Sequence, residues 1–317
     1  MKPILLFFAV LVSALSAGSV HAQQYFRIGT GGTAGTYYPI GVLVANIVSQ
    51  PGKVVATAQA SNGSLGNVIS VASGALESGF SQADVATWAE TGTGIFAGKP
   101  ALSGLRLIAN LFPESIQIVV RKDAGIKTVA DLRGRRVALD EAGSGTLISA
   151  RQVLAAYGLT ESDLKPAYIK TNQAADQLIA GALDAFFITA GAPAKAIADL
   201  AATGVRIDIL PIDGAPAQSL RQASPFLFSE TIEANTYPGV AAVKTLAVGA
   251  QWITNDKVDA ELVYQIAKAL YSEAGQKGLA KGHAKGSYIT LSNAVRGAGI
   301  PLHPGAERYY REAGVLK

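Results

Sequence analysis

The fold is decided by the sequence G-T-G-G-T-A-G-T-Y-Y-P, which fills residues 29–39. It follows a short strand-like run at 25–28 and precedes an apolar segment at 40–48 that is long enough for a helix. In such a strand–loop–helix junction, glycines let the backbone approach a ligand closely. The free N–H groups and the positive dipole end of the following helix favour an anion. A plain glycine turn between two elements is the alternative.

The first 22 residues have the pattern of a secretory signal peptide. Lys2 precedes an apolar run at 4–15, and Val20-His21-Ala22 offers small residues at the two cleavage positions. We therefore expect cleavage after Ala22 and a mature chain in the periplasm. A membrane anchor is the alternative, but the apolar run is short for a span.

Composition excludes several kinds of site. The chain has no cysteine, which rules out disulfides, thiolate metal sites and cysteine nucleophiles. Without the signal peptide the net charge is about +3, which is too small to indicate nucleic-acid binding. We expect no metal, no cofactor and a monomer.

Short apolar strands alternate with helical segments along almost the whole chain, which predicts an α/β architecture with mainly parallel sheets. Strand-like runs lie at 54–58, 105–109, 116–120, 136–140 and 185–189, and helical patterns at 64–73, 146–157 and 259–274. Loops rich in glycine or hydroxyl groups follow strands at 31–37, 61–64 and 143–146, with a less polar one at 190–193. Ligands of open α/β sheets bind where such loops gather, so two facing lobes would enclose a small polar solute.

At these loops the chain resembles the TAXI family of TRAP-transporter solute-binding proteins. The matching segments follow in family order over almost all the mature chain: 30–39, 61–64 with Asn67, 82–85, 143–146, 184–187, 191–193, 236–239, 303–306 and Tyr309-Tyr310. Two departures are visible, since Ala34 stands where the family often has glycine and Leu65-Gly66 replaces a more polar pair. The second departure bears on ligand preference.

The resemblance implies a type II periplasmic binding protein with two α/β lobes, a hinge and a ligand cleft between them. Lobe I is expected to comprise residues 23–112 and 238–317, and lobe II residues 113–237, with boundaries at Pro113 and near Tyr237. It further implies capture of a small carboxylate, such as glutamate or a C4 or C5 dicarboxylate, and its delivery to a TRAP-type membrane permease. A periplasmic sensor that presents the solute to a membrane receptor is the alternative.

The resemblance also implies which residues bind the ligand. The expected ligand-binding set is Thr33, Thr36, Tyr37, Ser61, Ser64, Gln82, Ser144, Gly145, Thr146, Gly191 and Tyr237. Some of these have simpler roles open to them: Ser144 is suited to helix capping, Gln82 to a supporting contact, and Tyr237 to packing.

Charge patterning predicts how an anion would be held. No acidic residue lies between Gln23 and Glu77, so we expect binding to depend on oriented N–H and O–H donors more than on a salt bridge. A buried segment of low polarity is an equal alternative. If Glu141 faces the cleft, it would favour a ligand ammonium, and therefore an amino acid over a plain diacid.

Two enzyme classes fit the sequence poorly, and we expect no catalysis. The stretch 29–34 matches the G-x-G-x-x-A dinucleotide fingerprint, but the acid expected about 20 residues later is absent. A secreted hydrolase would need a G-x-S-x-G elbow, of which 79–83 is the nearest approach and ends in alanine. Only His283 and His303 remain in the mature chain, without an H-E-x-x-H pair.

Overall fold

The computed structural model of the protein describes residues 23–317, so the predicted signal peptide lies outside it. One mixed sheet of ten strands runs through the molecule in the order β2-β1-β3-β10-β4-β7-β5-β6, with β8 on β4 and β9 on β10. None of the helices formed by residues 23–317 has the length and apolar character to span a membrane.

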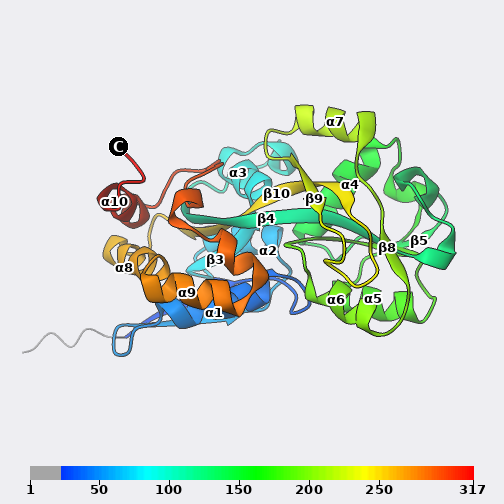
Figure 1. Cartoon of the computed structure of the whole chain (residues 1–317). Helices are drawn as coiled ribbons and strands as arrows, with labels where there is room; N and C mark the ends of the chain where they lie inside the picture. The colour runs from blue at the N-terminus through cyan, green and yellow to red at the C-terminus, as the bar shows by residue number, and fades with distance from the viewer. Residues whose placement is uncertain (1–22) are drawn as a thin grey trace, which may run out of the picture.

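Lobe I combines both ends of the described chain, which lie together on the left of Figure 1. Its N-terminal elements are β1 (Gln24–Gly29), α1 (Tyr37–Val48), β2 (Val54–Gln59), α2 (Ser64–Ala72), β3 (Ser78–Gln82), α3 (Ala83–Thr91) and the 3₁₀ turn η1 (Gly94–Phe96). Its C-terminal elements are α8 (Ala260–Leu270), α9 (Glu273–Gly282), η5 (Ala284–Tyr288), η6 (Leu291–Asn293) and α10 (Pro304–Glu312). Strand β1 pairs in parallel with β2 and β3, as alternating strands and helices predict.

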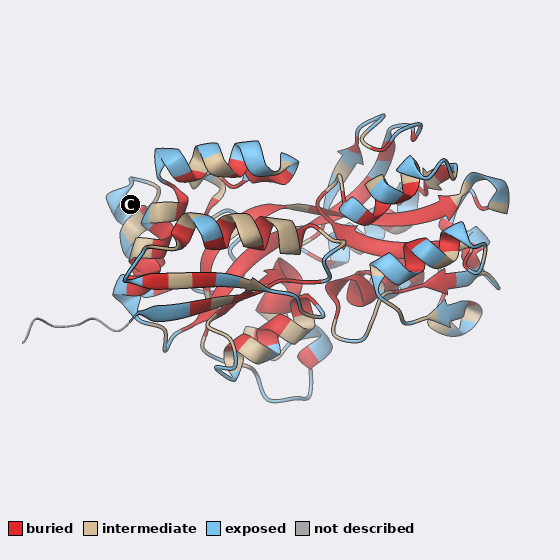
Figure 2. Ribbon diagram, turned by 90° about the horizontal axis from the view of Figure 1, so that it is seen from below, coloured by how far each residue is buried: buried red, intermediate tan, exposed pale blue. Residues whose placement is uncertain are grey.

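Lobe II is built from the intervening segment. Its strands are β5 (Arg136–Ala138), β6 (Lys165–Ala167), β7 (Ala185–Ala190), β8 (Ile207–Ile209) and β9 (Phe228–Ile232). Its helices are α4 (Gly145–Ala156), α5 (Thr171–Ile179), α6 (Lys195–Ala202) and α7 (Gly214–Ala223), with 3₁₀ turns η2 (Lys122–Ala124), η3 (Val129–Leu132) and η4 (Glu161–Asp163). Figure 2 shows the buried strands between helices that turn exposed faces outward.

Two long antiparallel strands, β4 (Leu105–Arg121) and β10 (Val243–Asn255), join the lobes. The sequence predicts a break at Pro113 between two strands, but β4 is continuous and Pro113 lies opposite Gly249. Proline has no amide hydrogen to donate, and the pairing shifts register beside it, between Gly249 and Gln251. This irregularity lies where the chain passes from one lobe to the other.

The boundary predicted at residue 237 falls within lobe II packing. Tyr237, Val240 and Val243 belong to one buried cluster with residues of β7 and α6. The first half of β10 pairs with β9 in lobe II, whereas its second half pairs with β3 in lobe I from Ala250 onward. We therefore propose that lobe II extends to about Gly249, and that the two crossings lie side by side.

Candidate functional site

A cavity of about 70 Å³ lies between the two lobes. Lobe I contributes residues from the β1–α1 loop, the start of α2 and the end of β3, and lobe II contributes the loops after β5 and β6 together with β7. The lining residues are Gly31, Gly32, Ala34, Gly35, Thr36, Tyr37, Asn62, Gly63, Ser64, Gln82, Glu114, Asp140, Glu141, Ser144, Gly145, Thr146, Lys170, Thr171, Asn172, Ile188, Thr189 and Ala190.

Four helices begin at the cavity wall: α1 at Tyr37, α2 at Ser64, α4 at Gly145 and α5 at Thr171. The first N–H groups of a helix have no partner within it and carry a partial positive charge. Both lobes therefore turn backbone donors toward the same space, as the glycine-rich loops predict.

The β1–α1 loop is held in place by side chains behind it. The Asn67 amide donates to the carbonyls of Gly29, Thr30 and Phe80, at 2.7–3.1 Å. Ser61 Oγ donates to the Thr30 carbonyl at 2.9 Å and accepts from the Gly63 N–H. Asn67 and Ser61 thus brace the loop.

On the lobe II side, the first residues of α4 have structural partners as well as a place in the wall. Ser144 Oγ accepts from Leu147 N–H at 3.0 Å and so caps the helix. Thr146 Oγ1 accepts from Thr189 N–H on β7 at 3.0 Å. A Cβ added at Gly145 would lie 2.4 Å from Gln82 Oε1 and 2.6 Å from Ser64 Oγ, so a larger residue here would force these lobe I side chains to move.

Hydrogen bonds between the lobes close the cavity on two sides. Thr36 Oγ1 donates to the Gly191 carbonyl at 2.7 Å, and the neighbouring Ala196 N–H donates to the Ala34 carbonyl. Across the opening, Gly66 N–H donates to the Gly143 carbonyl at 3.1 Å. On a third face, Ile148 of α4 is buried in a lobe I cluster that contains Val68 and Val85. The structure is a closed form.

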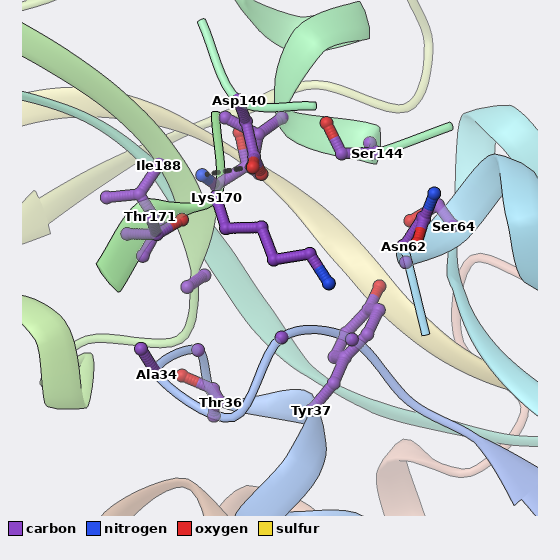
Figure 3. A pocket seen from close by; sticks show the side chains of 18 of the residues that line it. Ala34, Thr36, Tyr37, Asn62, Ser64, Asp140, Ser144, Lys170, Thr171 and Ile188 are labelled. Carbon is purple, nitrogen blue, oxygen red and sulfur yellow. Dashed lines mark hydrogen bonds between the residues drawn. The ribbon is translucent and has the colours of Figure 1, made fainter. Parts of the chain in front are cut away.

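Three carboxyl groups and one ammonium line the cavity: Glu114, Asp140, Glu141 and Lys170. Glu114 lies on β4 and accepts from the Tyr37 hydroxyl at 2.6 Å. Lys170 Nζ lies 3.6 Å from Glu141, and Figure 3 shows its side chain reaching from lobe II toward Tyr37 of lobe I. Charged side chains therefore line the cavity together with the neutral donors predicted from residues 23–76.

Burial changes the acidity of two of these carboxyls. Glu114 is 2% exposed, and loss of hydration raises its pKa to about 8, although the Tyr37 hydroxyl and the Lys285 ammonium act in the opposite direction. Loss of hydration likewise raises the pKa of Asp140 to about 6, with the neighbouring charge of Glu141 acting in the same direction. At pH 7 the Glu114 carboxyl is therefore mostly protonated, whereas the Asp140 carboxyl is mostly ionised.

The structure brings most of the predicted site residues together. Thr36, Tyr37, Ser64, Gln82, Ser144, Gly145 and Thr146 line the cavity. Thr33 is exposed and Ser61 lies behind the loop, so neither forms part of the wall. Gly191 contributes its carbonyl to closure and is not part of the lining.

Tyr237 is not a cavity wall. Its ring is completely buried in the lobe II core, and its hydroxyl accepts from Ala194 N–H at 2.9 Å and donates to Gln117 Oε1 at 2.7 Å. The packing alternative is therefore the one the structure supports, because both the ring and the hydroxyl are taken up by the lobe II core.

Sequence reasoning missed the residues that set the charge of the site. Glu114, Asp140 and Lys170 stand in no glycine-rich loop, and only Glu141 was singled out. A signal existed for Asp140, since it ends a strand just before the 143–146 loop. No local pattern identifies Glu114 or Lys170.

The sequence matches the profile of the NMT1-like family over residues 28–314, which is nearly the whole described chain.

Solved structures with a similar chain path share little sequence with this protein. A protein from Bordetella bronchiseptica is 14% identical, with a TM-score of 0.52, and the match covers 92% of this chain and 98% of that one. An ABC uptake transporter substrate binding protein from Streptococcus pneumoniae with bound histidine is 16% identical, with a TM-score of 0.51 and coverage of 84% and 94%. A Xanthomonas citri protein bound to ATP is 12% identical, with a TM-score of 0.50 and coverage of 92% and 96%. These likenesses concern the fold, and they confirm the predicted periplasmic-binding-protein architecture.

Proposed function

The chain belongs to the NMT1-like family, and on that premise we propose that it is a periplasmic solute-binding protein that captures a small carboxylate between its lobes and passes it to a TRAP-type membrane permease. Binding and release would involve no covalent chemistry. The ligand would favour the closed form because it contacts both lobes at once.

One observation carries this proposal: both lobes contribute the starts of helices to a single enclosed cavity, and hydrogen bonds between the lobes close it. Neutral N–H donors at helix starts hold carboxylates well. A site assembled from two lobes forms fully only on closure, which suits capture and release of a solute.

The charged residues of the cavity narrow the ligand class. A plain dicarboxylate would place two negative charges near Asp140 and Glu141, with Lys170 as the single lining cation among residues 23–317. The third lining carboxyl, Glu114, is mostly protonated at neutral pH because burial raises its pKa to about 8. An α-amino acid such as glutamate brings an ammonium for these carboxyls and a carboxylate for the helix starts. We therefore favour an amino acid over a dicarboxylate or a 2-oxo acid.

The proposed periplasmic location and permease type are supported by the sequence rather than by the cavity. The signal-peptide pattern at residues 1–22 supports export, and the resemblance to TAXI proteins supports a TRAP-type partner. The Streptococcus pneumoniae protein serves an ABC uptake transporter, but a likeness of 16% identity concerns the fold and does not decide between permease types. A sensor that presents the solute to a membrane receptor would use the same closing cavity and remains the second candidate.

A ligand screen tests the proposal. Purified mature protein would be unfolded, stripped of ligand, refolded and mixed with amino acids, dicarboxylates and 2-oxo acids while its melting temperature is followed. Binding to the native state raises that temperature by mass action. A rise with glutamate and not with 2-oxoglutarate supports an ammonium partner, whereas a rise with diacids alone would refute it. No rise with any carboxylate would remove the proposed ligand class.

A further inference from the structure

Two buried oxygen atoms in the cavity wall have no hydrogen-bond partner among residues 23–317. They are Gln82 Oε1, at the end of β3 in lobe I, and Thr189 Oγ1, on β7 in lobe II. Gln82 is 1% exposed and Thr189 is 8% exposed. Buried polar atoms of native proteins are nearly always paired, and an unpaired one is costly. These two oxygens therefore indicate that a bound group supplies their hydrogen bonds.

The two oxygens flank the first two residues of α4. A Cβ added at Gly145 would lie 2.4 Å from Gln82 Oε1. On the other side, Thr189 donates its backbone N–H to Thr146 Oγ1 at 3.0 Å, so its own hydroxyl belongs to the same corner of the wall. A single small group at the start of α4 is therefore within reach of both lobes.

The orientation of the Gln82 amide determines what kind of group it can bind. Its nitrogen donates to Ser149 Oγ at 3.4 Å, which leaves the oxygen on the side of Gly145. An amide oxygen only accepts hydrogen bonds. A fully ionised dicarboxylate or 2-oxo acid has acceptors and no N–H or O–H to donate, whereas an ammonium has three N–H donors. Gln82 thus favours an ammonium.

Asp140 supplies a negative charge in the same cavity. The lining cation Lys170 lies 3.6 Å from Glu141, and Asp140 has no ion-pair partner within residues 23–317. Its pKa of about 6 leaves it mostly ionised at pH 7. Asp140 has a φ of 70°, a left-handed conformation that is uncommon outside glycine and that recurs at ligand sites. An ammonium is the charge that this carboxylate can pair with.

Strand register brings Asp140 to the same part of the wall as Thr189. Strands β5 and β7 are parallel neighbours, with Ala138 opposite Phe186. Asp140 follows two residues after Ala138, and Thr189 three residues after Phe186, so both come at the carboxyl ends of adjacent strands. Both line the cavity.

We propose that Gln82 Oε1, Thr189 Oγ1 and the Asp140 carboxylate form a subsite for the α-ammonium of an amino acid, each accepting one of its three N–H groups. The neighbouring helix starts then bind the α-carboxylate. The subsite is complete only in the closed form, because Gln82 belongs to lobe I and the other two residues to lobe II. This assignment rests on the proposed function and deepens it by naming the groups that select an α-amino acid.

The test compares two ligands that differ only in the ammonium, L-glutamate and glutarate, by calorimetry on refolded, ligand-free mature protein at pH 7. We expect Thr189→Val and Gln82→Met each to weaken glutamate binding about tenfold or more while glutarate binding stays within about twofold. Asp140→Asn keeps the shape of the side chain and should weaken glutamate binding but strengthen glutarate binding, because a negative charge is removed. Equal losses for both ligands would overturn the subsite. Should Gln82→Met fail to fold, the other two variants decide.

A second readout needs no ligand. Thr245 of β10 is a buried threonine whose hydroxyl donates to the Ile116 carbonyl, which makes Thr245→Val the matched control. In urea denaturation of the ligand-free proteins, Thr245→Val should lower the midpoint and leave both affinities unchanged. Thr189→Val should not lower the midpoint, because the hydroxyl that it removes has no partner in the protein. A fall as large as that of Thr245→Val would show that the Thr189 hydroxyl is structural and overturn its role.

The wild type separates failure of the subsite from failure of the proposed function. If it binds glutarate and not glutamate, the protein is a carboxylate receptor and the ammonium subsite is wrong. If it binds no carboxylate at all, the proposed function fails, while the urea comparison still decides whether the Thr189 hydroxyl is free to bind a ligand.

Discussion

Replacing Glu114 with glutamine should stabilise the ligand-free protein while damaging its site. The carboxyl is buried on β4, and its pKa rises from 4.5 to about 8 because hydration is lost. In the unfolded chain this group ionises near its ordinary value, whereas the folded protein keeps the proton until higher pH. Glutamine removes that mismatch and can still accept the Tyr37 hydrogen bond.

The sign and size follow from proton linkage. Between about pH 4.5 and pH 8 the folded state binds one more proton than the unfolded state, so the free energy of unfolding falls as pH rises, by up to about 1.4 kcal/mol per unit. At pH 7 the accumulated cost from Glu114 is about 3 kcal/mol. Below the unfolded pKa the cost vanishes, and wild type and variant should then be equally stable.

Urea denaturation of the two proteins at pH 5, 6, 7 and 8 measures this cost. The slope with urea should stay constant, because the same surface is exposed on unfolding. Asp84 and Asp140 also have a pKa raised to about 6, so only the difference between variant and wild type isolates Glu114. Glu273→Gln, at an exposed residue, controls for loss of a negative charge. A difference that does not grow from pH 5 to pH 8 would refute the reasoning.

Three further variants test the site more locally. Tyr237→Phe removes a hydroxyl with two buried partners and should lower the free energy of unfolding by about 1–3 kcal/mol, with ligand affinity unchanged. A large loss of affinity in calorimetry would show that Tyr237 contributes to ligand binding after all. The double variant Ser144→Ala with Thr146→Ala should weaken ligand binding. It should also lower the free energy of unfolding by about 1–3 kcal/mol, because both hydroxyls accept hydrogen bonds from backbone N–H groups. Unchanged affinity would show that the loop before α4 does not contact the ligand. Thr36→Val deletes the donor to Gly191 and should weaken binding several-fold through faster loss of the closed form. Equal ligand dissociation rates in stopped-flow experiments would contradict this.

The strand–loop–helix junctions could be predicted from sequence because their determinants are local. Glycines at 29–35 and the apolar run behind them lie in one short segment, and they form a loop and helix at the expected place. The same holds for α4, where Ser144 caps a helix that ends before Gly158. Residues drawn from such junctions therefore account for nearly all of the predicted residues that line the cavity.

The lobe boundary and the role of Tyr237 could not be predicted in this way. A proline commonly ends a strand, yet Pro113 continues one because the partner strand changes register beside it. Whether Tyr237 turns toward a cleft or a core depends on Gln117, on Ala194 and on the buried residues of β7, all of which are distant from it in sequence. Only tertiary packing decides both.

The charge of the site shows why the ligand class was harder to predict than the fold. Residues 23–76 contain no acidic residue, so the part of the cavity wall that they form offers an anion hydrogen-bond donors and no negative charge. The carboxyls of Glu114, Asp140 and Glu141 come from β4 and lobe II and share a cavity with those donors in the closed form. We infer that recognition has two parts: lobe I holds a carboxylate, and closure adds the acceptors that an ammonium satisfies. A plain diacid should then bind more weakly than glutamate in calorimetry, because closing on it would bring its second carboxylate toward Asp140 and Glu141.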